Sequence, residues 1–314
     1  MAKKYAFGVD IGGTAVKIGL FTTTGKLLKS TEIPTDTTSN GENILPDIAK
    51  ALRENLKTLE SSFEEIEGIG MGVPGPVLND GTVNKCVNLG WGVINAADIM
   101  SSLCDGVIVK CGNDANVAAL GEMWQGGGRG YQNMVMVTLG TAVGGGVVIN
   151  GQIVSGAFGA GGEIGHIRVR DDEEDSCGCG KHGCLEQYAS ANGLVRVAKK
   201  LLASDNRQTV LRDAEVITSK VIFDAAKNGD AVSTELVETM GSYLGRALSY
   251  ISCVVDPEAF VIGGGVSRAG DILIDTIRKY YRENAFHASR NTAFALAELE
   301  NEAGMYGAVK LILK

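Results

Sequence analysis

Three cysteines and a histidine have the types and spacing of ligands for a tetrahedral metal ion. Cys177, Cys179 and Cys184 lie within eight residues, and His166 precedes Cys177 by eleven. Three thiolates and one imidazole fill the four positions of a structural zinc site. The glycines between the cysteines permit the tight loop that brings the sulfurs together. His182, inside the loop, competes with His166 as the fourth ligand.

A zinc-bound His166 would have a second function. If one ring nitrogen binds the metal, the other becomes a hydrogen-bond donor of fixed direction. Zinc would then orient a group for substrate contact and also stabilise the loop that carries Glu186.

A glycine-rich turn near the N-terminus combines backbone donors with a carboxylate, a hydroxyl and a cation. Gly12, Gly13 and Thr14 suit contact with phosphate groups, because glycines let backbone N–H groups approach an anion closely. Lys17 would neutralise phosphate charge, and Asp10 would hold Mg²⁺ through water. The Walker and dinucleotide motifs do not occur here. An ordinary hairpin turn is the alternative interpretation.

The segment 137–149 can be aligned with the segment 9–21. Each is predicted to form a strand, a Gly-Thr turn, an Ala-Val pair and a second strand. Two such halves are what a duplicated nucleotide-binding fold would contain. A triple glycine after a short strand also suits a nucleotide base or ribose, although it could be a simple helix-entry turn. The candidate nucleotide contacts in these segments are Gly140, Thr141, Gly263, Gly264 and Gly265.

An acidic residue follows a predicted strand and starts a predicted helix. Asp114 is placed there after Asn113, and either residue could simply cap the helix. Phosphoryl transfer to an alcohol, however, needs a carboxylate that orients the hydroxyl and takes its proton. Asp114 suits that task, Asn113 could contact neighbouring hydroxyls, and Glu163, His166 and Glu186 add further polar partners of the kind a sugar requires.

The elements that must position these residues alternate between strand and helix, which indicates an α/β protein with mixed sheets. Strands flank the turn after Asp10, and a third is expected near 26–33. Apolar residues recurring from Ile44 to Leu59 indicate an amphipathic helix. Further strands are expected at 66–73, 107–111, 135–139, 146–149 and 259–262, and further helices at 114–124, 186–204, 215–227, 231–255, 271–284 and 305–313.

Composition excludes several classes of protein. The 314 residues are 45% hydrophobic and 21% charged, as in ordinary globular proteins of one or two domains. The formal net charge is −8 and no basic run stands out, which disfavours nucleic acid and membrane surfaces as partners. No signal-peptide core or membrane-length apolar stretch is seen. We therefore expect a cytoplasmic protein whose seven cysteines are thiols or metal ligands.

Together these motifs resemble those of the ROK family of sugar kinases and sugar-responsive repressors. The matching stretches span nearly the whole chain in the family's order, and the Gly-His plus cysteine-loop pair is the most specific. They are Asp10-Ile-Gly-Gly-Thr14, Gly112-Asn-Asp-Ala-Asn116, Leu139-Gly-Thr-Ala142, Gly162-Glu-Ile-Gly-His166, Cys177-Gly-Cys-Gly-Lys-His-Gly-Cys-Leu-Glu186 and Gly263-Gly-Gly265.

The resemblance implies an α/β protein with the actin-like ATPase (ribonuclease H-like) fold, in which two α/β domains surround a cleft. The smaller N-terminal domain is expected to comprise 1–115 plus about 300–314, and the larger domain 116–299 with the zinc loop. Because family members commonly pair, a homodimer is expected.

The resemblance also implies ATP-dependent phosphorylation of glucose on its C6 hydroxyl, with Mg²⁺ beside ATP and structural Zn²⁺. The glucokinase-like interpretation rests on the Gly-Glu-Ile-Gly-His stretch and on Asn88-Leu-Gly-Trp91. Asp114 is implied as the catalytic base. Sugar contacts are implied for Asn113, Asp114, Glu163, His166 and Glu186, and zinc ligation for His166, Cys177, Cys179 and Cys184.

Several alternatives stay open on the sequence. Within the family, the substrate could be N-acetylmannosamine, N-acetylglucosamine or allose, and the donor could be polyphosphate. A sugar-responsive repressor would carry an added N-terminal helix-turn-helix, but the first strand begins near Tyr5. A non-catalytic, zinc-stabilised sugar-binding module would have no use for Asp10 and Lys17 at a phosphate turn.

Overall fold

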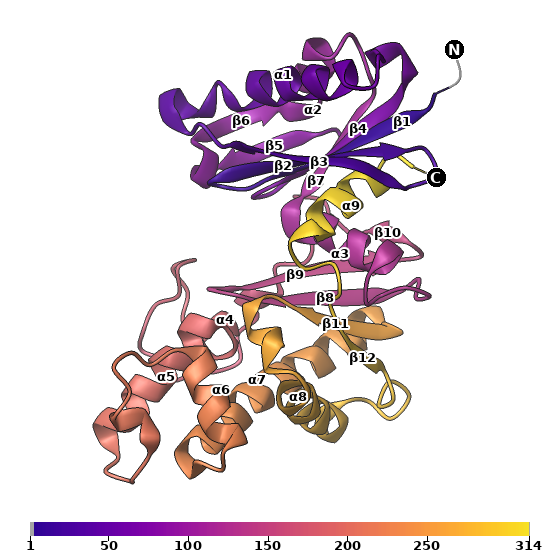
Figure 1. The fold of residues 1–314 in the computed structure, drawn as a ribbon. Coiled ribbons are helices and arrows are strands. Elements are labelled where there is room, and N and C mark those ends of the chain that lie inside the picture. Colours follow the sequence, from indigo (N-terminus) through magenta and orange to yellow (C-terminus); the bar gives the residue numbers. More distant parts are fainter. Residues whose placement is uncertain (1–2, 314) are drawn as a thin grey trace. The chain divides into compact units, whose positions relative to one another are not determined.

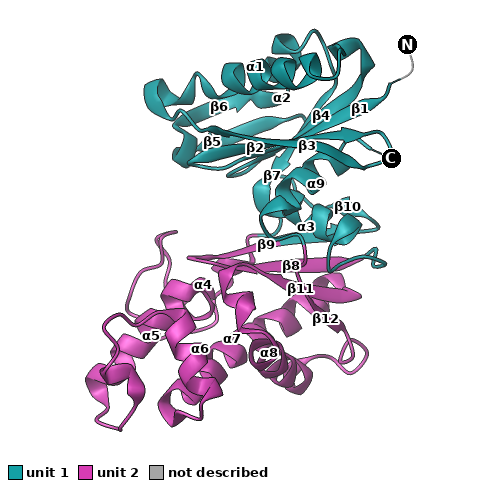
Figure 2. Cartoon of the chain, viewed as in Figure 1, with its two compact units in different colours: residues 1–132, 146–162, 299–314 teal, residues 133–145, 163–298 magenta. Residues whose placement is uncertain are grey.

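The computed structural model describes residues 3–313 (Figure 1). Contacts within the chain divide it into two compact units, coloured separately in Figure 2. Unit 1 contains the chain up to Gln132, the segment Gly146–Gly162 and the residues from Leu299 onwards. Unit 2 contains Asn133–Gly145 and Glu163–Glu298. One boundary between the units falls inside strand β9 (Val143–Ile149).

Unit 1 contains a five-stranded sheet with the order β3-β2-β1-β4-β7. The first three strands pair antiparallel, whereas β4 and β7 extend the sheet in parallel. Seven of the eight residues of β4 are buried, as expected of a central strand covered on both faces. The strands are β1 (Tyr5–Ile11), β2 (Ala15–Thr22), β3 (Leu27–Pro34), β4 (Ile66–Val73) and β7 (Val109–Asn113).

Helices cover both faces of this sheet (Figure 1). Helices α1 (Ile44–Lys57) and α2 (Ala96–Leu103) lie on one face, where Ile48 and Leu52 of α1 are fully buried. On the other face α9 (Ala303–Lys310) packs against β1 and β4, and α3 (Asp114–Gln125) packs against α9. A small hairpin of β5 (Thr82–Cys86) and β6 (Trp91–Asn95) completes this part of the unit.

The second five-stranded sheet has the order β10-β9-β8-β11-β12. Strand β11 runs parallel to both β8 and β12, and β10 pairs antiparallel with β9. When β8, β9, β10, β11 and β12 are matched to β1, β2, β3, β4 and β7, the two strand orders are the same. The structure therefore supports the duplication that the two similar Gly-Thr segments predicted. The strands are β8 (Met134–Leu139), β9 (Val143–Ile149), β10 (Gln152–Ile153), β11 (Ala259–Gly263) and β12 (Ala293–Leu296).

The helices of unit 2 form a layer beside β8 and β11 (Figure 1). The long helix α7 packs against α8, and the hydroxyls of Ser252 and Tyr281 join them by a buried 2.7 Å hydrogen bond. The helices are α4 (Glu186–Ala189), α5 (Ala191–Ser204), α6 (Ser219–Lys227), α7 (Ala231–Val255) and α8 (Asp271–Asn284). Among residues 3–313, none of the helices combines the length and apolar character that crossing a membrane requires.

Most of the expected elements are present, with some differences. Helices α7 and α8 and strand β4 have the predicted bounds. The expected helix 186–204 is broken at Ser190, whose extended backbone lets its hydroxyl accept a hydrogen bond from Gly193 N at 2.9 Å. The expected helix 215–227 starts later, at Ser219, because Thr218 caps it. Strands β5, β6, β10 and β12 and helix α2 were not predicted from the sequence.

The compact units also differ from the expected domain division. The expected boundary after residue 115 falls inside α3, but α3 stays in unit 1 because it packs against α9 of that unit. Segment 146–162 is likewise grouped with unit 1 rather than with the larger expected domain. The division into functional domains stays a prediction.

Candidate functional site

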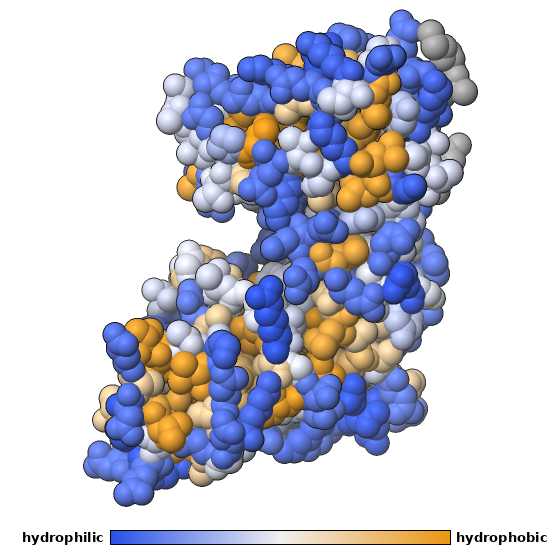
Figure 3. All heavy atoms as spheres, in the orientation of Figure 1, coloured by the Kyte–Doolittle hydropathy of each residue, from blue (hydrophilic) through white to orange (hydrophobic). Residues whose placement is uncertain are grey.

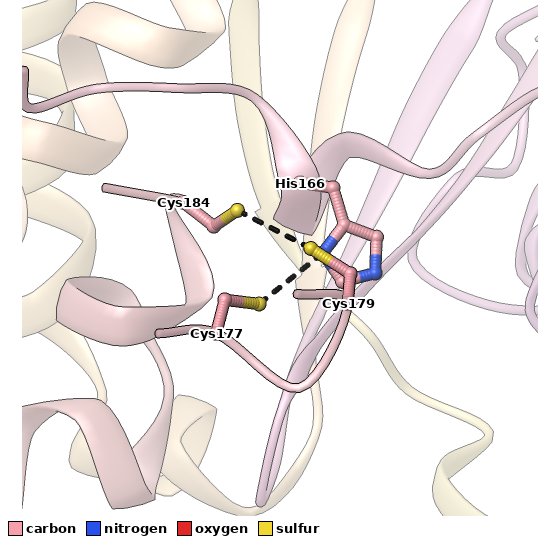
Figure 4. Close-up of side chains that lie close together, drawn as sticks. All are labelled: His166, Cys177, Cys179 and Cys184. Carbon is pink, nitrogen blue, oxygen red and sulfur yellow. Dashed lines mark hydrogen bonds between the residues drawn. The ribbon is translucent and has the colours of Figure 1, made fainter. Parts of the chain in front are cut away.

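The predicted zinc ligands lie together in unit 2 (Figure 4). The ligand atoms of His166, Cys177, Cys179 and Cys184 all lie within 4.8 Å of one another. Cys177 Sγ is 3.7 Å from His166 Nδ1, and Cys179 Sγ is 3.7 Å from Cys184 Sγ. A tetrahedral zinc ion with Zn–S bonds of about 2.3 Å holds its ligand atoms about 3.8 Å apart. The four side chains therefore fit zinc.

The structure separates the two histidines that competed for the fourth position. His166 ends a short 3₁₀ turn, Ile164–His166, and its ring lies beside the sulfurs. His182 is outside this cluster, and its residue forms a β-bridge with Ser176 at the base of the loop.

Hydrogen bonds hold the cysteine loop in shape. Cys177 N donates to Lys181 O at 2.7 Å and Gly180 N donates to Cys177 O at 2.8 Å, which closes a tight turn. Gln187 accepts from Cys184 N at 3.0 Å and donates to Asp175 O at 2.9 Å. The loop is thus anchored to α4.

A buried ion-pair network that the sequence analysis missed supports the segment before this loop. The Glu173 side chain is 4% exposed and accepts from Arg196 at 2.9 Å, from Lys200 at 3.1 Å and from the Tyr188 hydroxyl. The Arg196 hydrogen bond is the main cause that lowers the pKa of Glu173 far below its ordinary value. Nothing local marks Glu173, because it belongs to the acidic run 171–175, which resembles a solvated surface loop.

Two of the three sugar-contact candidates of unit 2, Glu163 and Glu186, flank the imidazole ring of the third, His166. Glu186 Oε1 lies 3.8 Å from His166 Nδ1 and accepts a hydrogen bond from Cys177 Sγ at 2.8 Å. Glu163 Oε2 lies 3.9 Å from the other ring nitrogen, Nε2. Because Nδ1 faces the sulfurs, Nε2 is left as the nitrogen beside Glu163.

In unit 1, Asn113 and Asp114 are held at the start of α3. Asn113 caps the helix by accepting from Asn116 N at 3.1 Å, so the capping interpretation is correct for this residue. Its amide also donates to Gly75 O at 3.1 Å and to Asp114 Oδ1 at 3.0 Å. Ala115 N donates to the same Asp114 oxygen at 2.8 Å. These two donors fix the orientation of the Asp114 carboxyl group at the start of the helix.

The N-terminal Gly-Thr turn of unit 1 is fixed by a residue that the sequence analysis missed. Thr35 donates its hydroxyl to Gly12 O at 2.7 Å and its N–H to Thr14 O at 3.0 Å. Gly12 N in turn donates to Ala15 O at 2.9 Å. Thr35 lies just after β3, far from the turn in sequence, and no local pattern points to this contact.

The two charged residues beside this turn face each other across the β1–β2 pair. Asp10 is opposite Lys17, and Lys17 Nζ donates to Asn301 O at 3.1 Å. Burial and the nearby charge of Asp114 raise the pKa of Asp10 to about 6, while Lys17 acts in the opposite direction. Unit 1 therefore brings both predicted carboxylates, Asp10 and Asp114, close enough to interact.

The glycine candidates of unit 2 lie where two neighbouring parallel strands, β8 and β11, end. Parallel pairing sets Gly263 opposite Thr138, so the turn at 140–141 and the turn at 263–265 follow neighbouring strand ends. Gly264 has a φ of 83°, and a Cβ there would be 2.6 Å from Leu139 O. Glycine is thus required where these two turns approach each other.

Comparison with known proteins shows the family to which the chain belongs. The model of the ROK family matches residues 6–314. The chain belongs to the ROK family. It has the actin-like ATPase fold of that family, with two related mixed sheets and their helices.

The similar proteins include named glucokinases. The chain is 39% identical to a glucokinase of Halalkalibacterium halodurans, over 98% of this chain and 94% of the relative. It is 37% identical to a glucokinase of Streptomyces coelicolor, over 97% and 96% of the two chains. The crystal structure of a ROK family glucokinase from Streptomyces griseus, in complex with glucose and AMPPNP, is 34% identical, covers 98% of each chain and has a TM-score of 0.74.

Proposed function

We propose that this ROK protein is a glucokinase, which transfers the γ-phosphoryl group of ATP to the C6 hydroxyl of glucose. The observation that carries the proposal is its nearly full-length similarity to glucokinases, at 39% and 37% identity. The Streptomyces griseus relative was crystallised with glucose and an ATP analogue, which supports both the sugar and the donor.

Asp114 is the proposed catalytic base. Its carboxylate is oriented by Asn113 and by Ala115 N. It would accept the proton of the C6 hydroxyl as the sugar oxygen forms its bond to the γ-phosphorus. The bond from that phosphorus to the bridging oxygen breaks, and ADP leaves with the electron pair.

The proposed sugar contacts are Asn113, Asp114, Glu163, His166 and Glu186. The flanking of His166 by two carboxylates supports the choice, because acceptors on both sides of one donor suit a row of hydroxyl groups. We expect Nε2 of His166 to donate to a sugar oxygen, since its other nitrogen faces the sulfurs.

The proposed nucleotide contacts are the backbone groups of Gly12, Gly13, Thr14, Gly140, Thr141, Gly263, Gly264 and Gly265. Mg²⁺ is a proposed cofactor, for which the partly buried carboxylate of Asp10 is the proposed partner through water. Lys17 would add positive charge near the phosphates, and its hydrogen bond to Asn301 O holds it near the turn.

Zinc is the proposed structural metal, on His166, Cys177, Cys179 and Cys184, whose ligand atoms cluster as zinc requires. When bound, it would fix the loop and the direction of the His166 ring. The chain's own contribution is to hold that loop on α4 through Gln187 and Asp175.

The protein is further proposed to be cytoplasmic and a homodimer. Figure 3 shows hydrophobic side chains gathered on the surface over α5 of unit 2. In the segment between α5 and α6, Val210 and Val216 are 58% and 65% exposed. Burial of such side chains in a contact between two copies would be favourable. Light scattering of the purified protein tests this proposal, and a mass of one chain would reject it.

The function is tested by ADP release with MgATP across glucose, mannose, allose, fructose, N-acetylglucosamine and N-acetylmannosamine. A clear kcat/KM preference for glucose is expected. A preference for an acetylated sugar would overturn the named substrate but keep the kinase. Absence of turnover with every sugar, in a zinc-loaded sample, would favour a sensing or binding protein. Polyphosphate in place of ATP tests the donor.

A further inference from the structure

Phe158 is a large apolar side chain that the fold of unit 1 leaves in solvent. It is 80% exposed, whereas Phe7 and Phe21 of the same unit are fully buried. Phenylalanine is usually buried, although single exposed apolar residues are common and need no explanation alone. The exposure of Phe158 is of interest because of the contacts that its loop makes.

The loop that carries Phe158, 156–162, is fixed by its neighbours. A Cβ on Gly159 would lie 2.9 Å from Val77 N and 3.2 Å from the carbonyl carbon of Pro76, so the loop backbone packs directly on that segment. Gly161 N donates to Ser155 O at 2.9 Å, which closes the loop on itself. Phe158 is thus presented on a backbone of defined shape.

The same loop is joined to the helix that carries the proposed base. Asn116, in the first turn of α3, donates its amide to Gly161 O at 2.9 Å. Asn113 donates to Gly75 O at 3.1 Å, next to the Pro76–Val77 segment under Gly159. Two independent contacts therefore tie the Phe158 loop to the elements that position Asp114.

We propose that Phe158 contacts the bound sugar and contributes to its binding by the kinase. This inference rests on the proposed function. A pyranose ring has C–H groups on its faces, and an aromatic side chain can pack on them while polar groups bind the hydroxyls. The cost of leaving Phe158 in water is then relieved only when sugar is bound, which contributes to affinity for sugar and not to the folding of the free protein.

The test compares wild type with Phe158→Ala, Phe158→Tyr and a matched control, Phe286→Ala. Phe286 is also exposed, at 60%, but belongs to unit 2 and follows α8. Glucose affinity is measured without nucleotide by calorimetry, and kcat and KM are measured with saturating MgATP. Thermal unfolding verifies that each variant is folded.

Loss of the ring is expected to weaken glucose binding and raise KM about tenfold, with kcat changed by less than about twofold. Phe158→Tyr should restore wild-type affinity, because it keeps the ring, and Phe286→Ala should behave as wild type. Unchanged glucose affinity in a folded Phe158→Ala variant would reject the inference. So would equal effects from Phe286→Ala.

Rejection of the proposed kinase activity would give results that differ from rejection of the role of Phe158. A wild-type protein that binds glucose without releasing ADP would reject the kinase activity, while the binding comparison would still decide the role of Phe158. A wild-type protein that neither binds nor phosphorylates any sugar would reject both.

Discussion

Gly304 lies directly against the carboxyl group of Asp10. A methyl group on Gly304 would be 2.8 Å from Asp10 Oδ1 and closer still to Asp10 Cγ. Gly304 is in the first turn of α9, and Asp10 is near the end of β1. The C-terminal helix therefore helps to set where the proposed magnesium-binding carboxylate can lie.

Gly304→Ala should displace this carboxylate. We expect kcat/KM for MgATP to fall about tenfold to a hundredfold, because small misplacements of reacting groups are costly. Overpacking should also lower the free energy of unfolding by about 1–3 kcal/mol. Gly92→Ala is the matched control, since a methyl group there meets nothing within 4 Å. Normal kinetics in Gly304→Ala would show that the position of Asp10 is not critical.

Asp10 also predicts how stability depends on pH. Its pKa in the folded protein is about 6, above the ordinary 3.8, first because of burial and second because of the charge of Asp114. The folded state therefore binds more protons than the unfolded state between these values, so the free energy of unfolding should fall as pH rises. The loss would approach about 3 kcal/mol.

The measurement is urea unfolding of wild type and Asp10→Asn from about pH 4 to pH 7, without divalent metal ions. Asp10→Asn cannot ionise and should lack this component of the pH dependence. The difference in unfolding free energy between the two proteins should therefore grow in favour of the variant as pH rises. A constant difference across the range would contradict the raised pKa.

Asp114→Asn should remove the proton acceptor while keeping its surroundings. The amide oxygen can still accept from Ala115 N, so α3 should start normally. We expect kcat to fall by about 10²–10⁴-fold, the usual contribution of a general base. Zinc content and circular dichroism should stay close to wild type. Near-normal kcat would reject the base assignment.

Cys179→Ser should abolish zinc binding and activity together. Cys179 contributes one of the four clustered ligand atoms, and three ligands hold a structural metal poorly. Zinc per chain is measured by mass spectrometry of the metal beside glucose turnover. Cys253→Ser, an exposed cysteine on α7 outside the cluster, should keep both. A zinc-free Cys179→Ser enzyme with full activity would reject the proposed coupling.

Local features of the chain were sufficient to predict much of this protein. Helix α7 starts where Asp230 accepts from Ser233 N at 2.8 Å, a capping contact made between near neighbours in sequence. The three sulfurs come together because glycines allow a tight turn within a short loop. Such features depend on residues a few positions apart, so their spacing in the chain carries the information.

Tertiary structure alone decided the contacts between distant segments. Thr35 bonding to Gly12, the Glu173–Arg196 pair and Gly304 against Asp10 join residues that have no shared local pattern. The same holds for α3, which belongs with unit 1 because it packs on α9, although the sequence placed a domain boundary at its start. Close packing and burial select these pairs from many that are compatible with the sequence, so they emerge only when the chain is folded.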